Sequence, residues 1–490
     1  MAPTSPLFVT LYGIVTLVAL LYFRPRRQSH ADSFPPGPKS PNMPTLDAWI
    51  QYEQWGREYG ELKNVLVLLR SSNDPSDEVV RLDPAFEGIA DFSLSRAGFN
   101  EVLALEHYSD KWRGNRRVFQ QNFRQSSSHR FYPAQYNKIS QYLHSLITVP
   151  EEFMQHTMSL SQGLIYSALY GLDVSSEDPL SKKAVEALVM FGRASLEPYP
   201  ALERYPWLRF MPSWFPGCGF QEIANKFRQN VTELGSIPLD QAKAGTGTSL
   251  IAELALASEG NPLDIKKIKT MGAGSLLAGA DTTMSAINAF LLTMVQHPNV
   301  QLKARAEIDR VIGRGRLPKF EDRRSLPYVE SVYREIMRMH PVLPLGVYHA
   351  SIEDDFYQGY HIPKGCVIVP NIWAMSRDPN VYSEPDRFMP ERFLDSPDGP
   401  FTSINDILAF GFGRRVCVGR YMADNTVWLA IASVLATLDL QKAKDNEGNE
   451  VDLPGEYTRT FFRHPKPYRS SIMPRDQQAR DLILAAAMVD

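Results

Sequence analysis

Residues 410–420 read FGFGRRVCVGR, and a helix is expected to run on from about residue 421. A cysteine just before a helix N-terminus receives backbone N–H groups and the positive end of the helix dipole, which lower the pKa of its thiol. The glycines of this segment permit tight turns and the close approach of a flat ligand, and Arg415 can neutralise a carboxylate. A lone cysteine presented in this way suits an axial ligand to haem iron, where a thiolate favours O–O cleavage.

The composition is that of a globular chain and argues against several other classes. Of the 490 residues, 44% are hydrophobic and 22% charged, unlike a disordered, collagen-like, coiled-coil or polytopic membrane protein. Lys and Arg total 52 against 55 Asp and Glu, a formal charge of -3, so nothing global indicates nucleic acid binding. Cys218, Cys366 and Cys417 are far apart, which argues against a disulfide framework or a cysteine-rich zinc site and favours a reducing compartment.

The N-terminus is expected to be a membrane anchor. Leu7–Phe23 carries no charge and as a helix would span about 26 Å, close to the roughly 27 Å hydrocarbon thickness of an endoplasmic reticulum bilayer. Arg24, Arg26 and Arg27 follow at once, so the bulk of the chain should be cytosolic. The alternative, a cleaved signal peptide, would need a positive N-terminal region and a small-residue cleavage site, and neither is evident.

The remaining chain divides into a hinge and one large domain. Residues 25–45 are basic and proline-rich, with Pro35-Pro-Gly-Pro38 forming a stiff extended segment between the anchor of residues 1–24 and the catalytic domain of residues 46–490. That domain is predicted to be mainly α with small β-sheets. Helices are expected at 138–170, 181–196, 264–296 and 325–340, and strands at 346–352, 359–362 and 367–369. Residues 199–220 are rich in proline and aromatics, typical of either a packed loop or an interfacial surface.

The long helix at 264–296 has an unusual middle. Residues 278–283 read AGADTT within an apolar stretch. Burying a carboxylate costs several kcal/mol unless it is paired or hydrated, and glycine costs up to about 1 kcal/mol relative to alanine in a helix interior. Both costs at one place indicate a functional distortion, such as a groove where a ligand meets the backbone. The alternative is a solvated Asp281 on a helix edge.

A glutamate and an arginine are expected to pair within the next helix. Glu335 and Arg338 stand at i, i+3 on one face, and Arg392, in a predicted loop, offers a second guanidinium. The alternative is a routine surface ion pair worth less than about 1 kcal/mol.

These motifs together resemble the cytochrome P450 family, membrane-anchored haem-thiolate monooxygenases of fungal type, over residues 1–38 and about 108–475. The family's cysteine signature, Phe-x-x-Gly-x-Arg-x-Cys-x-Gly, is matched by Phe410, Gly413, Arg415, Cys417 and Gly419. Its other motifs are matched by Glu335 and Arg338 with Arg392, by Ala278, Gly279, Asp281 and Thr282, and by Trp112 and Arg116, with His349 near a further haem-contacting position.

The resemblance implies a P450 fold that holds haem b, with Cys417 as the axial ligand of its iron. The family's roles carry over as cofactor-binding for Phe410, Gly413, Arg415, Gly419, Trp112, Arg116 and His349, as catalytic proton delivery for Asp281 and Thr282, and as structural for Glu335, Arg338 and Arg392. Substrate contacts are expected by position at Gly279, Ala280, 343–345 and 460–461.

The implied reaction inserts one oxygen atom from O2 into a hydrophobic organic substrate at the endoplasmic reticulum membrane. Electrons would come from NADPH through NADPH-cytochrome P450 reductase, or alternatively through cytochrome b5. A basic face would steer that acidic partner, made of Lys111, Arg113, Arg117, Arg414 and Arg420.

One departure from the family pattern leaves other functions open. Only 51 residues separate Gly60 from Trp112, where the family has two strands, a helix and a substrate loop. A haem-poor or inactive membrane-bound relative is therefore an alternative. So is a haem-thiolate isomerase or dehydratase that needs no reductase, although the intact Asp281-Thr282 pair argues against it. A thiol hydrolase using Cys417 is weaker, since no motif places a histidine near it.

Overall fold

The computed structural model describes residues 46–59, 102–175, 177–196, 206–216, 218–245, 249–357, 359–364, 366–394 and 399–488. The predicted anchor and hinge (1–45) lie outside the described residues, as do residues 60–101 of the shortened segment. No helix within the described ranges is long and apolar enough to cross a membrane.

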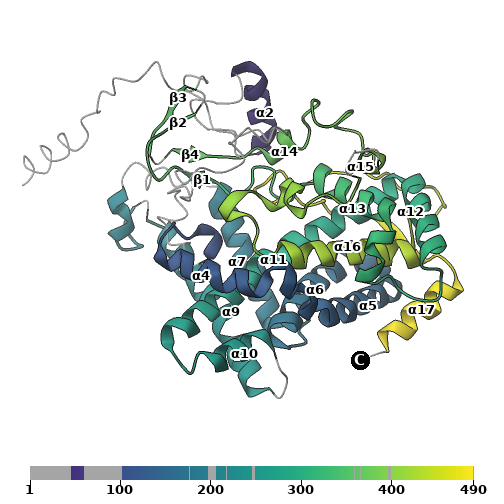
Figure 1. Ribbon diagram of the computed structural model, residues 1–490, viewed down its shortest axis with the longest axis horizontal. Helices are drawn as coiled ribbons and strands as arrows, with labels where there is room; N and C mark the ends of the chain where they lie inside the picture. The colour runs from purple at the N-terminus through teal and green to yellow at the C-terminus, as the bar shows by residue number, and fades with distance from the viewer. Residues whose placement is uncertain are drawn as a thin grey trace, which may run out of the picture.

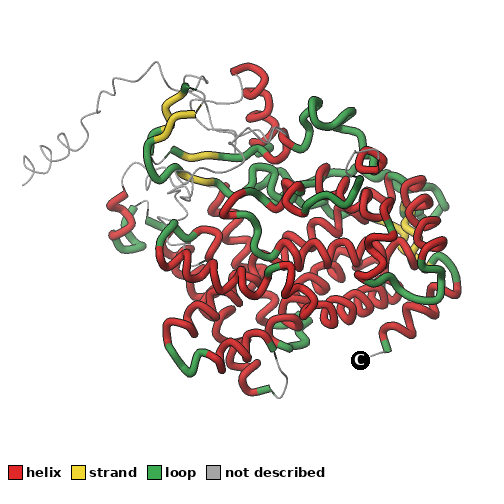
Figure 2. The backbone as a smooth tube through the Cα atoms, in the orientation of Figure 1, coloured by secondary structure: helices red, strands yellow, loops and turns green. Residues whose placement is uncertain are grey.

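Helices dominate the described chain (Figures 1 and 2), as predicted. The longer ones are α2 (Ala48–Tyr59), α4 (Asp110–Phe123), α5 (Tyr132–Thr148), α6 (Phe153–Ile165), α7 (Pro179–Leu196), α9 (Phe220–Ala244), α10 (Leu250–Ala257), α11 (Pro262–Gln296), α12 (Pro298–Val311), α13 (Pro327–Met339), α16 (Arg420–Thr437) and α17 (Gln477–Ala487). Two short helices, α14 (Ile372–Met375) and α15 (Glu391–Leu394), lie within the long connection between α13 and α16.

The strands form separate antiparallel pairs. β1 (His349–Ala350) pairs with β4 (Val367–Ile368), and β2 (Asp355–Tyr357) with β3 (Tyr360–Ile362). β1, β3 and β4 lie within the predicted strands, whereas β2 was not predicted, and the four make two pairs and not one sheet. A third pair, β5 (Leu438–Lys442) with β6 (Ser470–Pro474), was not predicted and lies at the opposite side of the molecule in Figure 2.

Two of the predicted helices show how local signals decide the boundaries. The prediction at 264–296 is confirmed by α11, which starts at Pro262 after Asn261, whose side chain accepts the backbone N–H of Leu263 (3.0 Å). The single helix predicted at 138–170 is wrong, because α5 ends at Thr148 and α6 begins at Phe153. Pro150 follows Val149, and proline disfavours helical geometry in the residue before it.

Helices α11 and α16 form the centre of the fold (Figure 1). The second half of α11 is buried on nearly all sides, as its apolar sequence predicted, and α16 is buried from Val427 to Thr437. α5 is tied to α16 through Gln135, whose amide donates to the Met422 carbonyl (3.0 Å) and the Thr426 hydroxyl (2.8 Å). The cysteine loop therefore leads into one of the most firmly packed helices of the chain.

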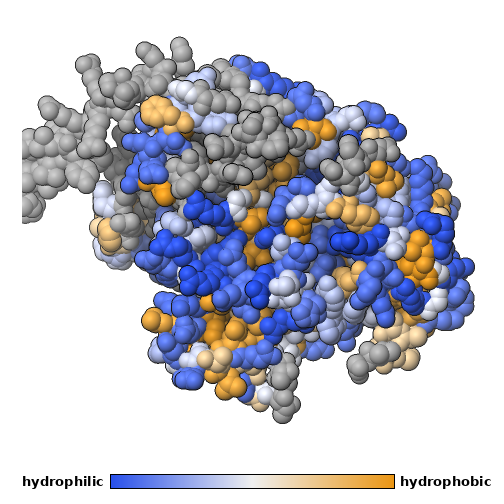
Figure 3. All heavy atoms as spheres, in the orientation of Figure 1, coloured by the Kyte–Doolittle hydropathy of each residue, from blue (hydrophilic) through white to orange (hydrophobic). Residues whose placement is uncertain are grey.

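The surface is mainly hydrophilic on the face drawn in Figure 3, with hydrophobic atoms gathered in its middle and along its lower edge. Elsewhere, residues 206–216 expose the large aromatic side chains Trp207 (50%), Phe210 (75%) and Trp214 (79%). Leu208 and Cys218 are buried beneath them. This part of the predicted 199–220 loop is thus packed on one side and aromatic on the other.

Candidate active site

The cysteine loop closes on itself through two glycines. The backbone N–H of Cys417 donates to the carbonyl of Phe410 (2.8 Å), and Gly411 and Gly413 have φ of 74° and 54°, a region that other residues rarely adopt. The predicted need for glycine is confirmed at these two positions. Gly419 has an ordinary φ of -84°, so no tight turn requires glycine there, and the close approach of a flat ligand at this position stays a prediction.

Cys417 opens into a mostly apolar cavity between the cysteine loop, α4, α11 and β1. The residues that the sequence singled out and that the structure places on this wall are Trp112, Arg116, Ala278, Gly279, Thr282, His349, Phe410, Arg415, Cys417 and Gly419. Gly413 and Asp281 are not among the lining residues. Four segments that are distant in the sequence therefore meet around one sulfur atom.

The environment of Cys417 changes one expectation. Burial raises the pKa of its thiol, although a hydrogen bond from the Gly419 backbone and the charges of Arg116 and Arg420 act to lower it. The sequence predicted a lowered pKa, and that is wrong because burial outweighs the local effects. A metal ion bound to the sulfur would reverse this balance, since a coordinated thiol is deprotonated outright.

Two buried guanidinium groups lie beside the cysteine. Burial lowers the pKa of both Arg116 and Arg415 to about 10, and their mutual repulsion adds to the effect at Arg415. Arg415 stacks over the ring of Trp112 (4.4 Å to the centroid) and donates to the carbonyl of Glu106 (3.2 Å). The Glu106 carboxylate itself is held by Lys111 (2.6 Å), so it only partly offsets these two charges.

Helix α11 forms the wall opposite the cysteine loop. It runs as continuous α-helix through residues 278–283, so the predicted distortion is not observed. The hydroxyl of Thr282 donates to the carbonyl of Ala278 (2.8 Å) and lines the cavity. An added Cβ at Gly279 would lie 3.0 Å from Cδ1 of Ile165, so packing of α6 explains this glycine at least as well as a ligand does.

Asp281 faces away from this cavity. It lines a second pocket between α6, α7, α11 and the loop 460–464, where Nε2 of His464 lies 3.3 Å from its Oδ2. Its side chain is 15% exposed, so neither a fully solvated nor a fully buried carboxylate is observed. Sequence reasoning missed His464, because no local pattern links a C-terminal loop to the middle of α11.

The predicted pairing of Glu335 with Arg338 and Arg392 is confirmed. Arg338 donates Nε and a terminal nitrogen to the two oxygens of Glu335 (2.7 and 2.8 Å), and Nε of Arg392 donates to Oε1 (3.1 Å). The Glu335 side chain is 0% exposed, which excludes the alternative of a surface ion pair. These three residues are called the triad below.

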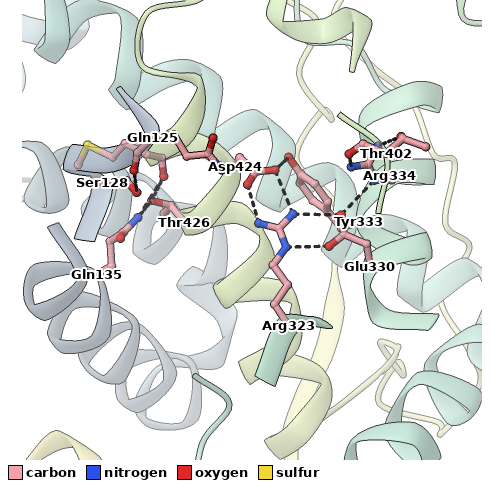
Figure 4. Close-up of polar contacts among 11 residues, drawn as sticks. Gln125, Ser128, Gln135, Arg323, Glu330, Tyr333, Arg334, Thr402, Asp424 and Thr426 are labelled. Carbon is pink, nitrogen blue, oxygen red and sulfur yellow. Dashed lines mark hydrogen bonds and ion pairs between the residues drawn. The ribbon is translucent and has the colours of Figure 1, made fainter. Parts of the chain in front are cut away.

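A second ion cluster, which the sequence analysis did not find, lies near the start of α16 (Figure 4). Arg323 binds the carboxylate of Asp424 (2.5 and 3.0 Å) and that of Glu330 (2.8 and 3.1 Å). Arg334 also donates to Glu330 (3.0 Å), and the Tyr333 hydroxyl donates to Asp424 (2.7 Å). The residues Arg323, Glu330, Arg334 and Asp424 are called the four-charge cluster below.

The wall of the first cavity fits the haem that the resemblance implies. Its apolar lining suits a flat macrocycle, and Cys417 offers sulfur as an axial ligand. Nε of Arg116 is buried and has no hydrogen-bond partner among the described residues. Two desolvated guanidinium groups beside the thiol would be neutralised by the propionate groups of a haem.

Comparison with known proteins bears on the whole chain. The family model for cytochrome P450 matches residues 68–471. The chain is 34% identical to cytochrome P450 monooxygenase 136 of Postia placenta, over 98% of this chain and 96% of that protein. It is 30% identical to a tryptamine 4-monooxygenase of Psilocybe cyanescens, over 96% of this chain and 98% of that protein. A second Postia placenta relative, cytochrome P450 monooxygenase 208, is 33% identical over 96% of both chains.

Proposed function

This chain belongs to the cytochrome P450 family and is a haem-dependent monooxygenase, and from that premise we propose that it oxidises a hydrophobic organic substrate with electrons from NADPH. The observation that carries the proposal is the meeting of Cys417, Arg116, Arg415 and Thr282 on the wall of one apolar cavity. Cys417 would hold haem b through its sulfur, while Arg116, Arg415, Trp112 and His349 would hold its propionate side.

Haem bound there would activate dioxygen, with two electrons and two protons consumed for each oxygen atom inserted and the second oxygen atom leaving as water. The chain's own part is to bind the substrate, exclude water and deliver protons. The Thr282 hydroxyl gives its hydrogen to the Ala278 carbonyl, so its oxygen lone pairs can accept a hydrogen bond from water in the cavity. Asp281, one residue away, is proposed to supply the proton; its carboxylate faces the second pocket, so this role requires the side chain to turn toward the cavity.

The apolar character of the wall supports a hydrophobic substrate. Of the contacts expected by position, Gly279 and Leu343 line the first cavity, whereas Ala280 and Thr460 line the second pocket. Leu345 instead packs in a small core with Trp49 and Tyr52. One relative is a tryptamine 4-monooxygenase, which makes indole amines reasonable members of a substrate panel.

A flavoprotein reductase, or alternatively cytochrome b5, is proposed to dock on the cysteine side. Lys111, Arg113, Arg117 and Arg414 are exposed there at α4 and the cysteine loop. Lys111 and Arg113 form ion pairs with Glu106 and Asp110, which offset part of their charge. Steering by this face should therefore depend on salt concentration.

Attachment to the endoplasmic reticulum membrane, with the catalytic domain in the cytosol, is proposed from the apolar segment at 7–23 and the arginines after it. The exposed rings of Trp207, Phe210 and Trp214 support a second point of contact, since aromatic side chains favour the headgroup region of a bilayer.

The first test is the carbon monoxide difference spectrum of the reduced protein. We expect the red-shifted Soret band of thiolate-bound haem in the native chain, and its complete loss in Cys417→Ala. An absent or imidazole-like band in the native chain would favour the haem-poor alternative raised by the short 60–112 segment. Conversion of a panel member into an isomer or a dehydrated product without NADPH or reductase would instead favour a reductase-free isomerase or dehydratase.

A further inference from the structure

The second pocket, on the other side of α11 from the cysteine, has a volume of about 360 Å³. Helix α7 contributes only aliphatic side chains to it, α6 contributes Met158 and Gln162, and α11 contributes Asp281 next to Met284. Loop 460–464 closes it with His464. Asp281 and His464 are the only titratable residues among the described ones that line this pocket. Within that set, each is the only possible charged neighbour of the other.

The loop fixes the backbone of His464 directly beside α11. The Ser285 hydroxyl, one turn after Asp281, donates to the carbonyl of Arg463 (2.9 Å). The backbone N–H of His464 donates to the Thr458 hydroxyl (2.9 Å), and its carbonyl accepts the backbone N–H of Thr458 (2.7 Å). Three hydrogen bonds therefore fix the backbone at His464, the point from which the imidazole projects.

The polar atoms around this imidazole are incompletely paired. Nε2 of His464 lies 3.3 Å from Oδ2 of Asp281. That Oδ2, Nδ1 of His464 and Oε1 of Gln162 are buried and have no hydrogen-bond partner among the described residues. Buried polar atoms are nearly always satisfied, by water where protein groups do not reach them, and a pocket of this size has room for several water molecules.

We propose that His464 is a positioning residue, which holds the Asp281 carboxylate in contact with water in the second pocket and thereby keeps it supplied with protons. Thr282 faces the cysteine cavity and Asp281 faces this pocket, so the two residues join two compartments across α11. The contact between His464 and Asp281 does not depend on the proposed function. Only the delivery of the proton to the cysteine cavity rests on it.

The proton balance closes without another reactant. Protonated Asp281 turns from the second pocket toward the cysteine cavity, gives one proton to water held at Thr282 and returns as a carboxylate. Pocket water then returns one proton to the carboxylate and is replenished from solvent, so the protein ends unchanged and no electron passes through these residues. His464 keeps Nε2 beside the carboxylate, 3.3 Å from Oδ2, and is not consumed.

The first test uses dioxygen as the sole oxidant, with NADPH and reductase and no organic substrate. With electrons from NADPH, reduction of dioxygen to water takes four electrons and four protons, whereas reduction to hydrogen peroxide takes two of each, so a poorer proton supply should shift the products toward peroxide. In His464→Phe we expect the peroxide formed per NADPH to rise about threefold or more, as it should in Thr282→Ala. His464→Gln retains a side-chain donor and should restore most of the native ratio. Met284→Leu, a volume-conserving change in the same pocket, is the control.

The second test needs no turnover. The thermal unfolding of haem-loaded Asp281→Asn, His464→Phe and the double variant gives a double-mutant cycle. Because the two side chains lie 3.3 Å apart, their effects should be non-additive, and the double variant should lose less stability than the two single variants together.

These outcomes distinguish a failure of the role proposed for His464 from a failure of the proposed function. Unchanged peroxide yield in His464→Phe, or additive effects in the double-mutant cycle, would overturn the role of His464 while the carbon monoxide spectrum stays that of a thiolate. A threefold rise in Met284→Leu, or no recovery in His464→Gln, would assign the effect to packing and would also overturn it. Loss of the thiolate spectrum from the native chain would overturn the proposed function itself.

Discussion

Helix α13 carries two buried ion clusters that differ in their charge balance and in what they join. The triad sets one carboxylate, Glu335, against two guanidinium groups. Its surplus positive charge is met by backbone carbonyls, since Arg338 donates to Ser376 and Pro385 (2.7 and 2.9 Å) and Arg392 donates to Ser383 (2.6 Å). The triad therefore pins a long irregular loop onto the helix.

The four-charge cluster sets two carboxylates against two guanidinium groups and joins regular elements. Arg323 comes from the turn before α13, and Asp424 from the second turn of α16. Arg334 continues the cluster to the Thr402 carbonyl (2.7 Å), as Figure 4 shows. Glu330 and Glu335 are five residues apart, or about 140° around the axis, so one helix presents the two clusters on different faces.

The comparison shows two ways of making a buried charge tolerable. In the triad a single glutamate serves both arginines, so its loss leaves two buried cations without a counter-ion. In the four-charge cluster Arg323 is paired with two carboxylates, Glu330 and Asp424, so the loss of Asp424 still leaves it a counter-ion. The two clusters should therefore differ in how strongly the protein depends on any one member.

The largest effect is expected for Glu335→Gln. Removing one partner from a buried ion pair costs about 3–5 kcal/mol, a large part of the 5–15 kcal/mol that stabilises a typical domain. We expect little folded, haem-binding protein, measured by urea unfolding and by the carbon monoxide spectrum. The same change at Glu58, exposed on α2, is the control and should alter stability by less than about 0.5 kcal/mol.

A smaller loss is expected for Asp424→Asn. The amide keeps the shape and one acceptor, and Arg323 retains Glu330, so we expect about 1.5–3 kcal/mol, the worth of hydrogen bonds to a charged group. The protein should fold and bind haem, with a lowered urea midpoint. A loss of stability as large as that of Glu335→Gln would contradict the idea that Glu330 still neutralises Arg323 when Asp424 is lost.

Local patterns predicted what local interactions decide. The Glu335–Arg338 pair stands at i, i+3, the tight turns at Gly411 and Gly413 follow from glycine itself, and α11 follows from its apolar run. The reverse case is Cys417, where the helix N-terminus predicted a lowered pKa but burial, set by the tertiary fold, raises it.

Contacts between distant segments left no signal in the sequence. Arg323 and Asp424 are partners only because α16 packs beside the turn that precedes α13, and β5 pairs with β6 across a loop that carries His464. The Asp281–His464 contact belongs to the same class. The contact on which the proposed proton supply depends is thus one that only the fold could reveal.

The smallest effect, and the one that most sharpens the comparison, is expected for Tyr333→Phe. Burial and the Asp424 carboxylate raise the pKa of Tyr333 well above its ordinary value, so its hydroxyl stays protonated and donates at every pH at which the protein is folded. Its removal leaves Asp424 bound to Arg323, so the free energy of unfolding should fall by only about 1–1.5 kcal/mol.

Tyr328→Phe on the same helix is the matched control, because its hydroxyl donates to Glu391 (3.1 Å), a carboxylate that is 34% exposed. Water can replace the lost donor there, so the change should be smaller than at Tyr333. Equal losses at the two tyrosines would mean that burial of Asp424 adds nothing. A loss at Tyr333 above that of Asp424→Asn would mean that the hydroxyl, and not Arg323, is the main partner of this carboxylate.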